Sequence, residues 1–179
     1  MQHVNISHLE YEQALKALQI ATSHLSNIAI TIDFGADYAQ SKIIRDFVSQ
    51  IFEYHKIETP WGGRFTLITD ELINNAIEHG SSEGDIDSCV IEAGREKNGG
   101  FYIILEVHDT GNGKDAKTAH EMSIVRSNKK EKIEGGIYME KRGRGLFHIT
   151  EKLVDRLEFH ESPKGGLAVR IEKAIPKKI

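Results

Sequence analysis

Apolar and polar residues alternate along several short segments of this chain, most clearly between Phe101 and Asp109. There the apolar side chains occupy every second position and so share one face of an extended segment. The same alternation runs over residues 28–34, 157–159 and 167–171. Such alternation is typical of half-buried strands, which favour an antiparallel sheet covered by helices on one face only. The sequence therefore predicts an α+β fold, a two-layer sandwich with a mixed, mostly antiparallel sheet.

Turn residues and helical spacing define the other elements. A further strand is predicted over about 88–94, and Gly165-Gly166 is the expected hairpin turn between the last two strands. Ser7 to Glu10 matches a capping box before a helix of about four turns, and Asp37 is the expected cap of a second helix. Apolar residues at helical spacing in three predicted helices are Leu9, Leu15, Leu18 and Leu25, then Ile43, Ile44, Phe47, Ile51 and Phe52, then Phe65, Ile68, Leu72 and Ala76.

Residues 114–142 are rich in charge and lack apolar periodicity, so we expect a long irregular loop there. A short helix is predicted to follow over residues 146–154.

Composition narrows the class of protein. The 179 residues suffice for one domain with a sizeable core. A net charge of −4 argues against binding to nucleic acid, which normally needs a basic surface. The N-terminus lacks the features of a signal peptide, and no apolar run is long enough to span a membrane. Because Cys89 is the only cysteine, an intrachain disulfide is excluded, and we expect a reduced, cytoplasmic protein.

Two polar residues lie near the end of the third predicted helix, in Glu71-Leu-Ile-Asn-Asn75-Ala-Ile-Glu-His79-Gly80. Glu71 and Asn75 are four residues apart, so they share one face of the helix. A carboxylate can accept a proton there, and a carboxamide oxygen can bind a hard cation such as Mg²⁺. Two polar residues at this spacing usually belong only to a solvated helix face. Whether this pair indicates a functional site therefore depends on the motifs that follow.

The first of these motifs, Asp109-Thr-Gly111-Asn-Gly113, follows a predicted strand. Aspartate and glycine are common in turns at strand ends, which is the purely structural interpretation. The functional interpretation is that the glycines let the backbone approach a flat ligand while the carboxylate accepts a hydrogen bond from an amine.

The second motif, Arg142-Gly143-Arg-Gly145-Leu146, opens the last predicted helix. Exposed amides at a helix N-terminus form an anion site suited to phosphate, although Gly-x-Gly before a helix is common. The sequence contains neither a P-loop nor the glycine pattern of a dinucleotide fold, which excludes those two nucleotide sites.

The order and spacing of the three motifs resemble the N, G1 and G2 boxes of the GHKL superfamily, whose ATP-binding domain is the Bergerat fold and which includes DNA gyrase and the histidine kinases. Gly80 and Asp109 are 29 positions apart, and Gly113 and Gly143 are 30 apart. The segment from Gly143 to Asp155 is most similar to the anti-sigma-factor serine/threonine kinases of bacterial partner-switching pathways. The resemblance covers roughly residues 28–173.

The resemblance implies ATP and Mg²⁺ as ligands and a role for each motif residue. Glu71 matches the general base and Asn75 the metal ligand. Asp109 matches the adenine-reading carboxylate, with Gly111 and Gly113 shaping the base pocket. The phosphate-binding turn corresponds to Gly143, Gly145 and the amide of Leu146, with Lys141 or Arg142 facing the γ-phosphate. Residues 114–142 correspond to the lid over the nucleotide.

One position departs from the family pattern. The last hairpin of the family usually places a threonine after glycine, where it completes the hydrogen bonds around adenine. This chain has Leu167 after Gly166. Because a leucine side chain neither donates nor accepts, weaker adenine binding or a different pocket is the expectation.

The expected organisation is an N-terminal helical extension over residues 1–27 and an ATPase domain over residues 28–179. The leucine stripe of the extension is expected to pack on the sheet or on a second subunit, which allows a homodimer. The branch implies a kinase that binds a sigma factor and phosphorylates an anti-anti-sigma protein of the STAS type. The alternatives are a nucleotide-independent partner-binding module with this fold, or the ATPase domain of a histidine-kinase-type protein.

Overall fold

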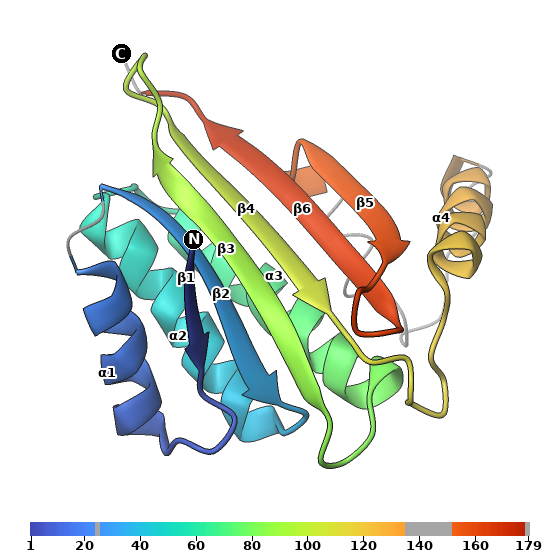
Figure 1. Ribbon diagram of the computed structural model, residues 1–179. Helices are drawn as coiled ribbons and strands as arrows, with labels where there is room; N and C mark the ends of the chain where they lie inside the picture. Colours follow the sequence, from blue (N-terminus) through green and yellow to red (C-terminus); the bar gives the residue numbers. More distant parts are fainter. Residues whose placement is uncertain (24–25, 135–151, 178–179) are drawn as a thin grey trace.

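A six-stranded sheet forms one layer of the protein (Figure 1). The structure is a computed structural model that describes residues 1–23, 26–134 and 152–177, with the backbone alone for 128–134. The strands lie in the order β1-β2-β3-β4-β6-β5. β1 pairs with β2 in parallel, and every other pair is antiparallel. The strands are β1 (Gln2–Asn5), β2 (Asn27–Gly35), β3 (Ile86–Arg95), β4 (Phe101–His108), β5 (Arg156–Glu161) and β6 (Leu167–Ile175).

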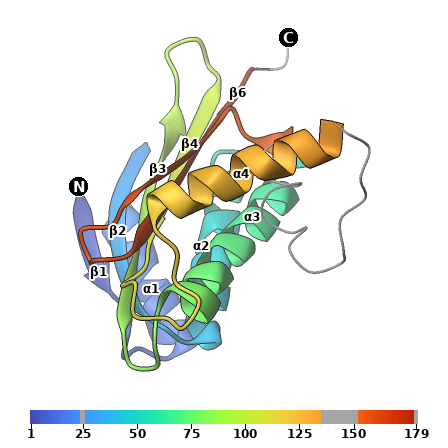
Figure 2. The ribbon, with the colours of Figure 1, turned by 90° about the vertical axis from the view of Figure 1, so that its right-hand side faces the viewer.

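Three helices form the second layer on one face of the sheet, as the view turned by 90° shows (Figure 2). They are α1 (Tyr11–Thr22), α2 (Tyr38–Tyr54) and α3 (Trp61–Asn75), and α3 continues into a π-helical turn, η1 (Ala76–Gly80). A fourth helix, α4 (Ala119–Glu134), lies beside β5, outside the two layers (Figure 1). The predicted α+β sandwich is therefore confirmed.

The core lies between the sheet and these helices. The inward residues of β2, among them Ile30, Ile32 and Phe34, are fully buried, as their alternation predicted. The ring of Phe52 on α2 lies 5.3 Å from that of Phe65 on α3 and 5.3 Å from that of Phe101 on β4. Aromatic contacts of this kind fix α3, and with it Glu71 and Asn75, against the sheet. No helix in the described part of the chain is both long and apolar enough to cross a membrane.

The N-terminal segment differs from expectation because it contains β1 as well as a helix. As one of the two expectations had it, α1 packs on the sheet, and Ala14 and Leu18 belong to the core. It also packs against α2, where the Tyr11 hydroxyl donates to Asp46 at 2.8 Å. The predicted capping box is wrong, because the N-cap of α1 is Glu10 and its side chain makes no capping hydrogen bond. The hydroxyl of Ser7 donates instead to Asn5 Oδ1 at 2.7 Å, at the end of β1. The predicted cap of α2 is confirmed, since Asp37 Oδ1 accepts from the amide of Ala39 at 2.9 Å.

The prediction of an irregular loop over 114–142 is also wrong, because α4 occupies residues 119–134. A reciprocal capping box starts this helix: the Thr118 hydroxyl accepts from the Glu121 amide at 3.2 Å, and the Glu121 carboxylate accepts from the Thr118 amide at 2.8 Å. Residues 135–142 lie outside the described residues. So does most of the helix predicted over 146–154, of which Lys152 and Leu153 are described and helical.

Candidate functional site

Glu71 and Asn75 lie one turn apart near the C-terminal end of α3, and both side chains are half-buried. Within the described residues neither side chain has a hydrogen-bond or ion-pair partner. The helix then widens into η1, which ends at Gly80. Short π-helical turns of this kind are frequent at functional sites. This arrangement leaves one carboxylate and one carboxamide available on the same helix face.

Asp109 is buried at the end of β4 and is held by two backbone amides, one from its own segment and one from the start of β6. Its Oδ1 accepts from the amide of Leu167 at 2.9 Å and from the amide of Gly111 at 3.0 Å. Among the described residues no group donates to Oδ2. Burial raises the pKa of Asp109, and the hydrogen bonds from Leu167 and Gly111 oppose that rise. The carboxylate is thus fixed through one oxygen while the other keeps its capacity to accept.

Glycines surround this carboxylate at close range. A Cβ atom at Gly80 would collide with Asp109 Oδ2, and one at Gly166 would collide with Asp109 Oδ1. Gly111 has a φ of +74°, and a Cβ at Gly113 would collide with the carbonyl oxygen of His79. Residues from η1, from the segment after β4 and from the β5–β6 turn therefore converge on Asp109. The predicted hairpin turn at Gly165-Gly166 is confirmed by the pairing of β5 with β6.

Leu167 takes part in this cluster through its backbone. Its amide donates to Asp109 Oδ1 and its carbonyl accepts from the Asp109 amide at 3.0 Å. Its side chain is buried and makes neither of these bonds. The absence of a threonine hydroxyl therefore leaves the positioning of Asp109 intact.

A polar network that the motifs did not predict lies beside Asp109. The hydroxyl of Ser81 donates to Asp87 Oδ1 at 2.5 Å and accepts from the amide of Thr110 at 3.1 Å. The Thr110 hydroxyl donates to Asp85 Oδ2 at 2.6 Å. These bonds tie η1, the start of β3 and the end of β4 together. They hold the two motif segments in a fixed relation.

Asp87 is fully buried, and in the described part of the chain its Oδ2 has no hydrogen-bond partner. Burial raises the pKa of Asp87 to about 6, against the hydrogen bond from Ser81, and the nearby Asp109 carboxylate raises it further. One signal in the sequence points to this residue: Asp87 shares its strand face with Cys89 and Ile91, which are buried apolar positions. An acidic residue in such a series is unusual, because burying its charge is energetically costly.

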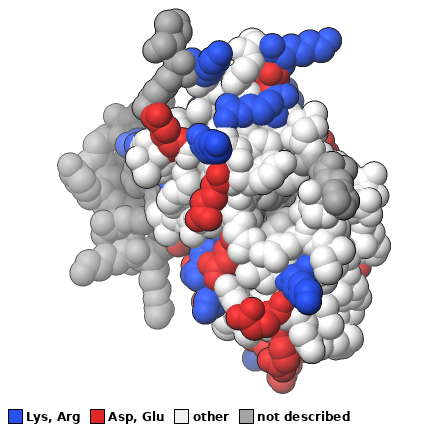
Figure 3. Space-filling model, turned by 90° about the vertical axis from the view of Figure 1, so that its left-hand side faces the viewer, with Lys and Arg blue, Asp and Glu red and all other residues white. Residues whose placement is uncertain are grey.

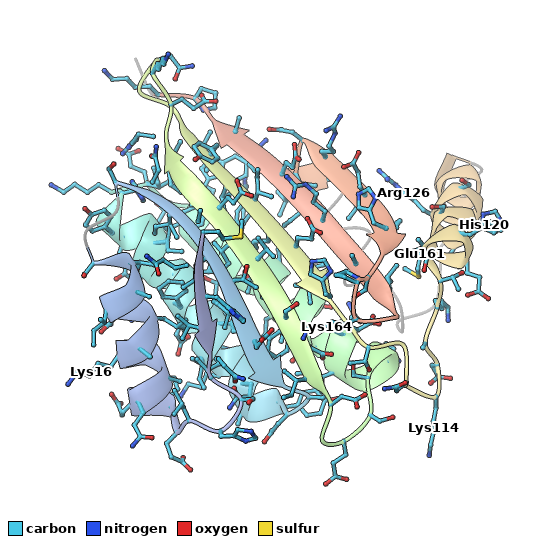
Figure 4. All side chains as sticks on the ribbon, viewed as in Figure 1. Lys16, Lys114, His120, Arg126, Glu161 and Lys164 are labelled. Atoms are coloured by element: carbon cyan, nitrogen blue, oxygen red, sulfur yellow. The ribbon has the colours of Figure 1, made fainter. Side chains whose placement is uncertain are left out.

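At the β5–β6 turn, Lys164 carries a positive charge near this end of the sheet (Figure 4). Its ammonium group lies 3.4 Å from the carboxylate of Asp33 on β2. The charge is therefore paired within the protein. The predicted phosphate-binding residues Lys141, Arg142, Gly143, Gly145 and Leu146 lie outside the described residues.

Comparison with protein families identifies the family of the chain. The model of the histidine kinase-like ATPase domain matches residues 34–173, which is more than half of the chain. The chain belongs to this family. No curated protein matches the sequence. The match includes Glu71, Asn75 and Asp109 as well as the predicted phosphate-binding turn.

Membership of the histidine kinase-like ATPase family implies ATP as a ligand, and Mg²⁺ typically accompanies it. The described residues fit an adenine amine at Asp109, because Oδ1 is held by two amides while no described group donates to Oδ2, and because glycines let three backbone segments come close to this carboxylate. Within the described residues no group of three or more His, Cys, Asp or Glu side chains could hold a metal ion. A Mg²⁺ ion here would depend on Asn75, on phosphate oxygens and on water, which is its usual coordination in nucleotide sites.

Proposed function

We propose that this protein is an ATP- and Mg²⁺-dependent protein serine/threonine kinase that acts as an anti-sigma factor in the cytoplasm. Its phosphoacceptor would be an anti-anti-sigma, STAS-type protein, and its second partner a sigma factor. The family match supports the ATP-using part of this proposal. The kinase activity and the partners rest on the resemblance of the motif residues to the anti-sigma branch.

The observation that most supports phosphate transfer is the pair of unpartnered side chains on α3. Glu71 lies one helical turn before Asn75, so a carboxylate stands beside the predicted metal ligand. In the proposed reaction Glu71 accepts the proton of the attacking serine or threonine hydroxyl. Bound ATP supplies the phosphoryl group, and Mg²⁺ neutralises charge on its phosphates.

The remaining residues bind and orient the nucleotide in this proposal. Asp109 accepts from the exocyclic amine of adenine through Oδ2, and Gly111 and Gly113 give the ring space. Gly143, Gly145 and Leu146 hold phosphate through backbone amides. Lys141 or Arg142 faces the γ-phosphate. The lid includes α4 and the segment that follows it.

A nucleotide-independent binding module is the second candidate. Leu167 in the place of a threonine favours it, because weaker adenine binding would suit a module that works without nucleotide. Because the Leu167 amide, and not its side chain, holds Asp109, that feature carries less weight. The ATPase domain of a histidine-kinase-type protein remains a third candidate, and transfer to histidine instead of serine or threonine would identify it.

Two variants test the proposal. Glu71→Gln removes the base but keeps the size of the side chain, so phosphate transfer to the partner should slow by about 10²–10⁴-fold with unchanged Mg-ATP affinity. Asn75→Ala removes the metal ligand, so it should weaken Mg-ATP binding itself. Calorimetry measures nucleotide affinity, and radiolabel transfer from ATP to the partner measures the rate.

The partner for this assay comes from co-purification of the tagged protein with and without ATP. Glu71 and Asn75 are half-buried and have no hydrogen-bond or ion-pair partner among the described residues. Their replacement should therefore change the free energy of unfolding by only a few tenths of a kcal/mol, so both variants should remain folded. Unchanged transfer in Glu71→Gln contradicts the general-base role. Absence of Mg-ATP binding by the wild type would favour the binding module.

A further inference from the structure

A cavity opens at the opposite end of the sheet from Asp109. It has a volume of about 490 Å³ and lies between the α2–α3 loop, the end of β3 and the residues after β6. Arg95 and Ile175 in its wall pair with Phe101, the first residue of β4, whereas Asp109 follows the last. Eight residues of strand therefore separate the two sites, or about 26 Å at roughly 3.3 Å per residue. The cavity is not part of the predicted nucleotide site.

The walls of this cavity are largely apolar. Ile57, Pro60, Trp61 and Pro176 contribute to them, together with the buried Ile175. Cavities of roughly 300–1,000 Å³ with apolar walls and a few polar groups are the usual sites of small organic ligands. The walls therefore suit the apolar body of a ligand of that size.

The charges at the cavity are mainly positive. Its lining contains the cations Lys56, Arg95 and Lys177 against a single carboxylate, Glu58. Three positive charges and one negative charge leave an excess of two, on a protein whose net charge is −4. Lys and Arg side chains gather at this end of the molecule in the space-filling view (Figure 3). The cavity is therefore positively charged although the whole chain has a negative net charge.

Arg95 is held in place without losing its charge. Its Nη1 donates to the carbonyl of Gly99 at 3.1 Å, and its Nη2 donates to the carbonyl of His55. Carbonyl groups orient a guanidinium but do not neutralise it, and Arg95 has no carboxylate partner among the described residues. Burial lowers the pKa of His55, and the Arg95 cation lowers it further, so this neighbouring ring stays neutral near pH 7. Arg95 is thus a fixed cation in the cavity wall.

The N-terminus of α3 adds to the same potential. The helix starts at Trp61, in the cavity wall, and no side chain caps it. The first amides of a helix carry a partial positive charge. The guanidinium carbon of Arg64 lies 5.1 Å from the centre of the Trp61 ring, which brings a further cation close to the aromatic wall.

We propose that this cavity, between the α2–α3 loop and the ends of β3 and β6, binds a small organic anion: an apolar, preferably aromatic body that carries one acidic group. The apolar body packs on Trp61 and Ile57. The acidic group faces Lys56, Arg95 and Lys177. Charge complementarity selects an anion over a neutral or cationic compound of the same shape.

The chain provides its own reporter for this site, because Trp61 is the only tryptophan. The probe is 8-anilinonaphthalene-1-sulfonate, an aromatic sulfonate that accepts excitation energy from tryptophan. Its neutral counterpart is N-phenyl-1-naphthylamine, which lacks the sulfonate. Titration of the full chain should give saturable quenching of Trp61 by the sulfonate, and roughly fivefold weaker quenching by the neutral probe.

Two matched double variants separate this cavity from general charge effects. Lys56→Gln with Lys177→Gln removes two cations of the cavity and should weaken sulfonate binding by roughly fivefold, with little change for the neutral probe. Lys16→Gln with Lys114→Gln removes the same charge elsewhere, on α1 and after β4 (Figure 4), and should leave the affinity unchanged. Equal affinities of the two double variants, or equal binding of both probes by the wild type, would overturn the proposal.

Discussion

At the level of single residues, Asp85 and Asp87 lie two positions apart but have opposite environments. Asp85 accepts from the Thr110 hydroxyl, the Ser82 amide and the Asn112 side chain, and these bonds lower its pKa. Asp87 is buried with one unpartnered oxygen, and burial raises its pKa to about 6. The ionised form of Asp87 is therefore costly in the folded protein. The pH dependence of stability should show that cost.

We predict that Asp87→Asn raises the free energy of unfolding relative to the wild type, and does so by more at pH 7.5 than at pH 5. In the folded wild type Asp87 holds its proton up to about pH 6, whereas in the unfolded chain it releases the proton near 3.8. The folded state thus binds more protons in this window, so its stability falls as pH rises from about 4 to about 6. From below the unfolded pKa to above the folded pKa the whole effect corresponds to about 3 kcal/mol, of which roughly half falls between pH 5 and pH 7.5. An asparagine has no such dependence. Urea unfolding at several pH values measures it.

Asp85→Asn is the control for this measurement. The pKa of Asp85 is lowered, so its contribution to stability is lost only as pH falls below the usual range of a carboxylic acid. Its removal should shift the curve of stability against pH between 5 and 8 without changing the slope. If Asp87→Asn and the wild type gave parallel curves, the burial of an ionisable Asp87 would be disproved.

Single residues also show what the sequence could and could not reveal about the site. Glu71, Asn75 and Asp109 can be proposed as site residues from the sequence alone because their motifs have fixed local spacing. Asp87 is harder to find, because its environment depends on a hydrogen bond from Ser81 and on the nearby Asp109 carboxylate, and no spacing in the sequence marks either. The effect of Leu167 on adenine binding stays a prediction, whereas the hydrogen bond from its backbone amide to Asp109 could not be foreseen, because a sequence does not show which backbone amides donate.

Among the secondary-structure elements, α4 depends most on local interactions. No residue of α4 belongs to the buried core among the residues whose side chains are described. Among its contacts with β5 is a hydrogen bond from Arg126 Nη1 to the Leu157 carbonyl at 2.7 Å. Its first turn is fixed by the capping box of Thr118 and Glu121.

Replacement of Thr118 by alanine should therefore loosen α4 without destabilising the whole domain. Loss of an N-cap side chain costs about 1 kcal/mol, which corresponds to roughly fivefold faster amide exchange in the first turns of the helix. The free energy of global unfolding should change by no more than a few tenths of a kcal/mol, because the core is untouched. Hydrogen exchange by mass spectrometry and urea unfolding measure the two effects.

Ser123→Ala is the matched control in the same helix. The Ser123 hydroxyl donates to the carbonyl of Ala119 at 2.9 Å and does not cap the helix. Alanine is a better helix former, so exchange over residues 119–127 should not accelerate. Equal protection of α4 in Thr118→Ala and the wild type would show that tertiary contacts, and not the cap, hold the helix.

The elements also differ in how well the sequence predicts them. β2, β4 and β6 were found because long alternation specifies both a strand and its buried face. β1 was missed because its four residues, Gln2–Asn5, show no alternation and form a strand only by pairing with β2. α4 was missed because its sequence lacks an apolar stripe, although the Thr118 and Glu121 pair was visible in it.

At the scale of the whole molecule, the candidate site joins segments that are far apart in the chain. η1 follows α3, Asp109 follows β4, and Leu167 begins β6, so a ligand at Asp109 would contact all three parts of the fold. A ligand that binds only the folded state stabilises it by mass action, by about 2.7 kcal/mol at a concentration of 100 Kd. Nucleotide binding should therefore raise the unfolding temperature of the entire domain.

We predict that Mg-ATP near 100 Kd raises the Tm by roughly 5–10 °C, the shift expected for a domain of this size. Mg-GTP at the same concentration should raise it much less. Guanine presents a carbonyl where adenine presents an amine, and a carbonyl oxygen facing Asp109 Oδ2 leaves two acceptors without a proton between them. Differential scanning fluorimetry with each nucleotide measures the difference.

Asp109→Asn tests the same contact with little disturbance of the fold. The asparagine keeps Oδ1, which accepts from Leu167 and Gly111, and replaces Oδ2 by an amino group. The stabilisation by Mg-ATP should then be lost, while the Tm without nucleotide changes little. Asp115→Asn, an exposed neighbour in the following loop, should keep the full response to Mg-ATP. Equal stabilisation of the wild type by both nucleotides, or a full ATP response in Asp109→Asn, would remove Asp109 from adenine recognition.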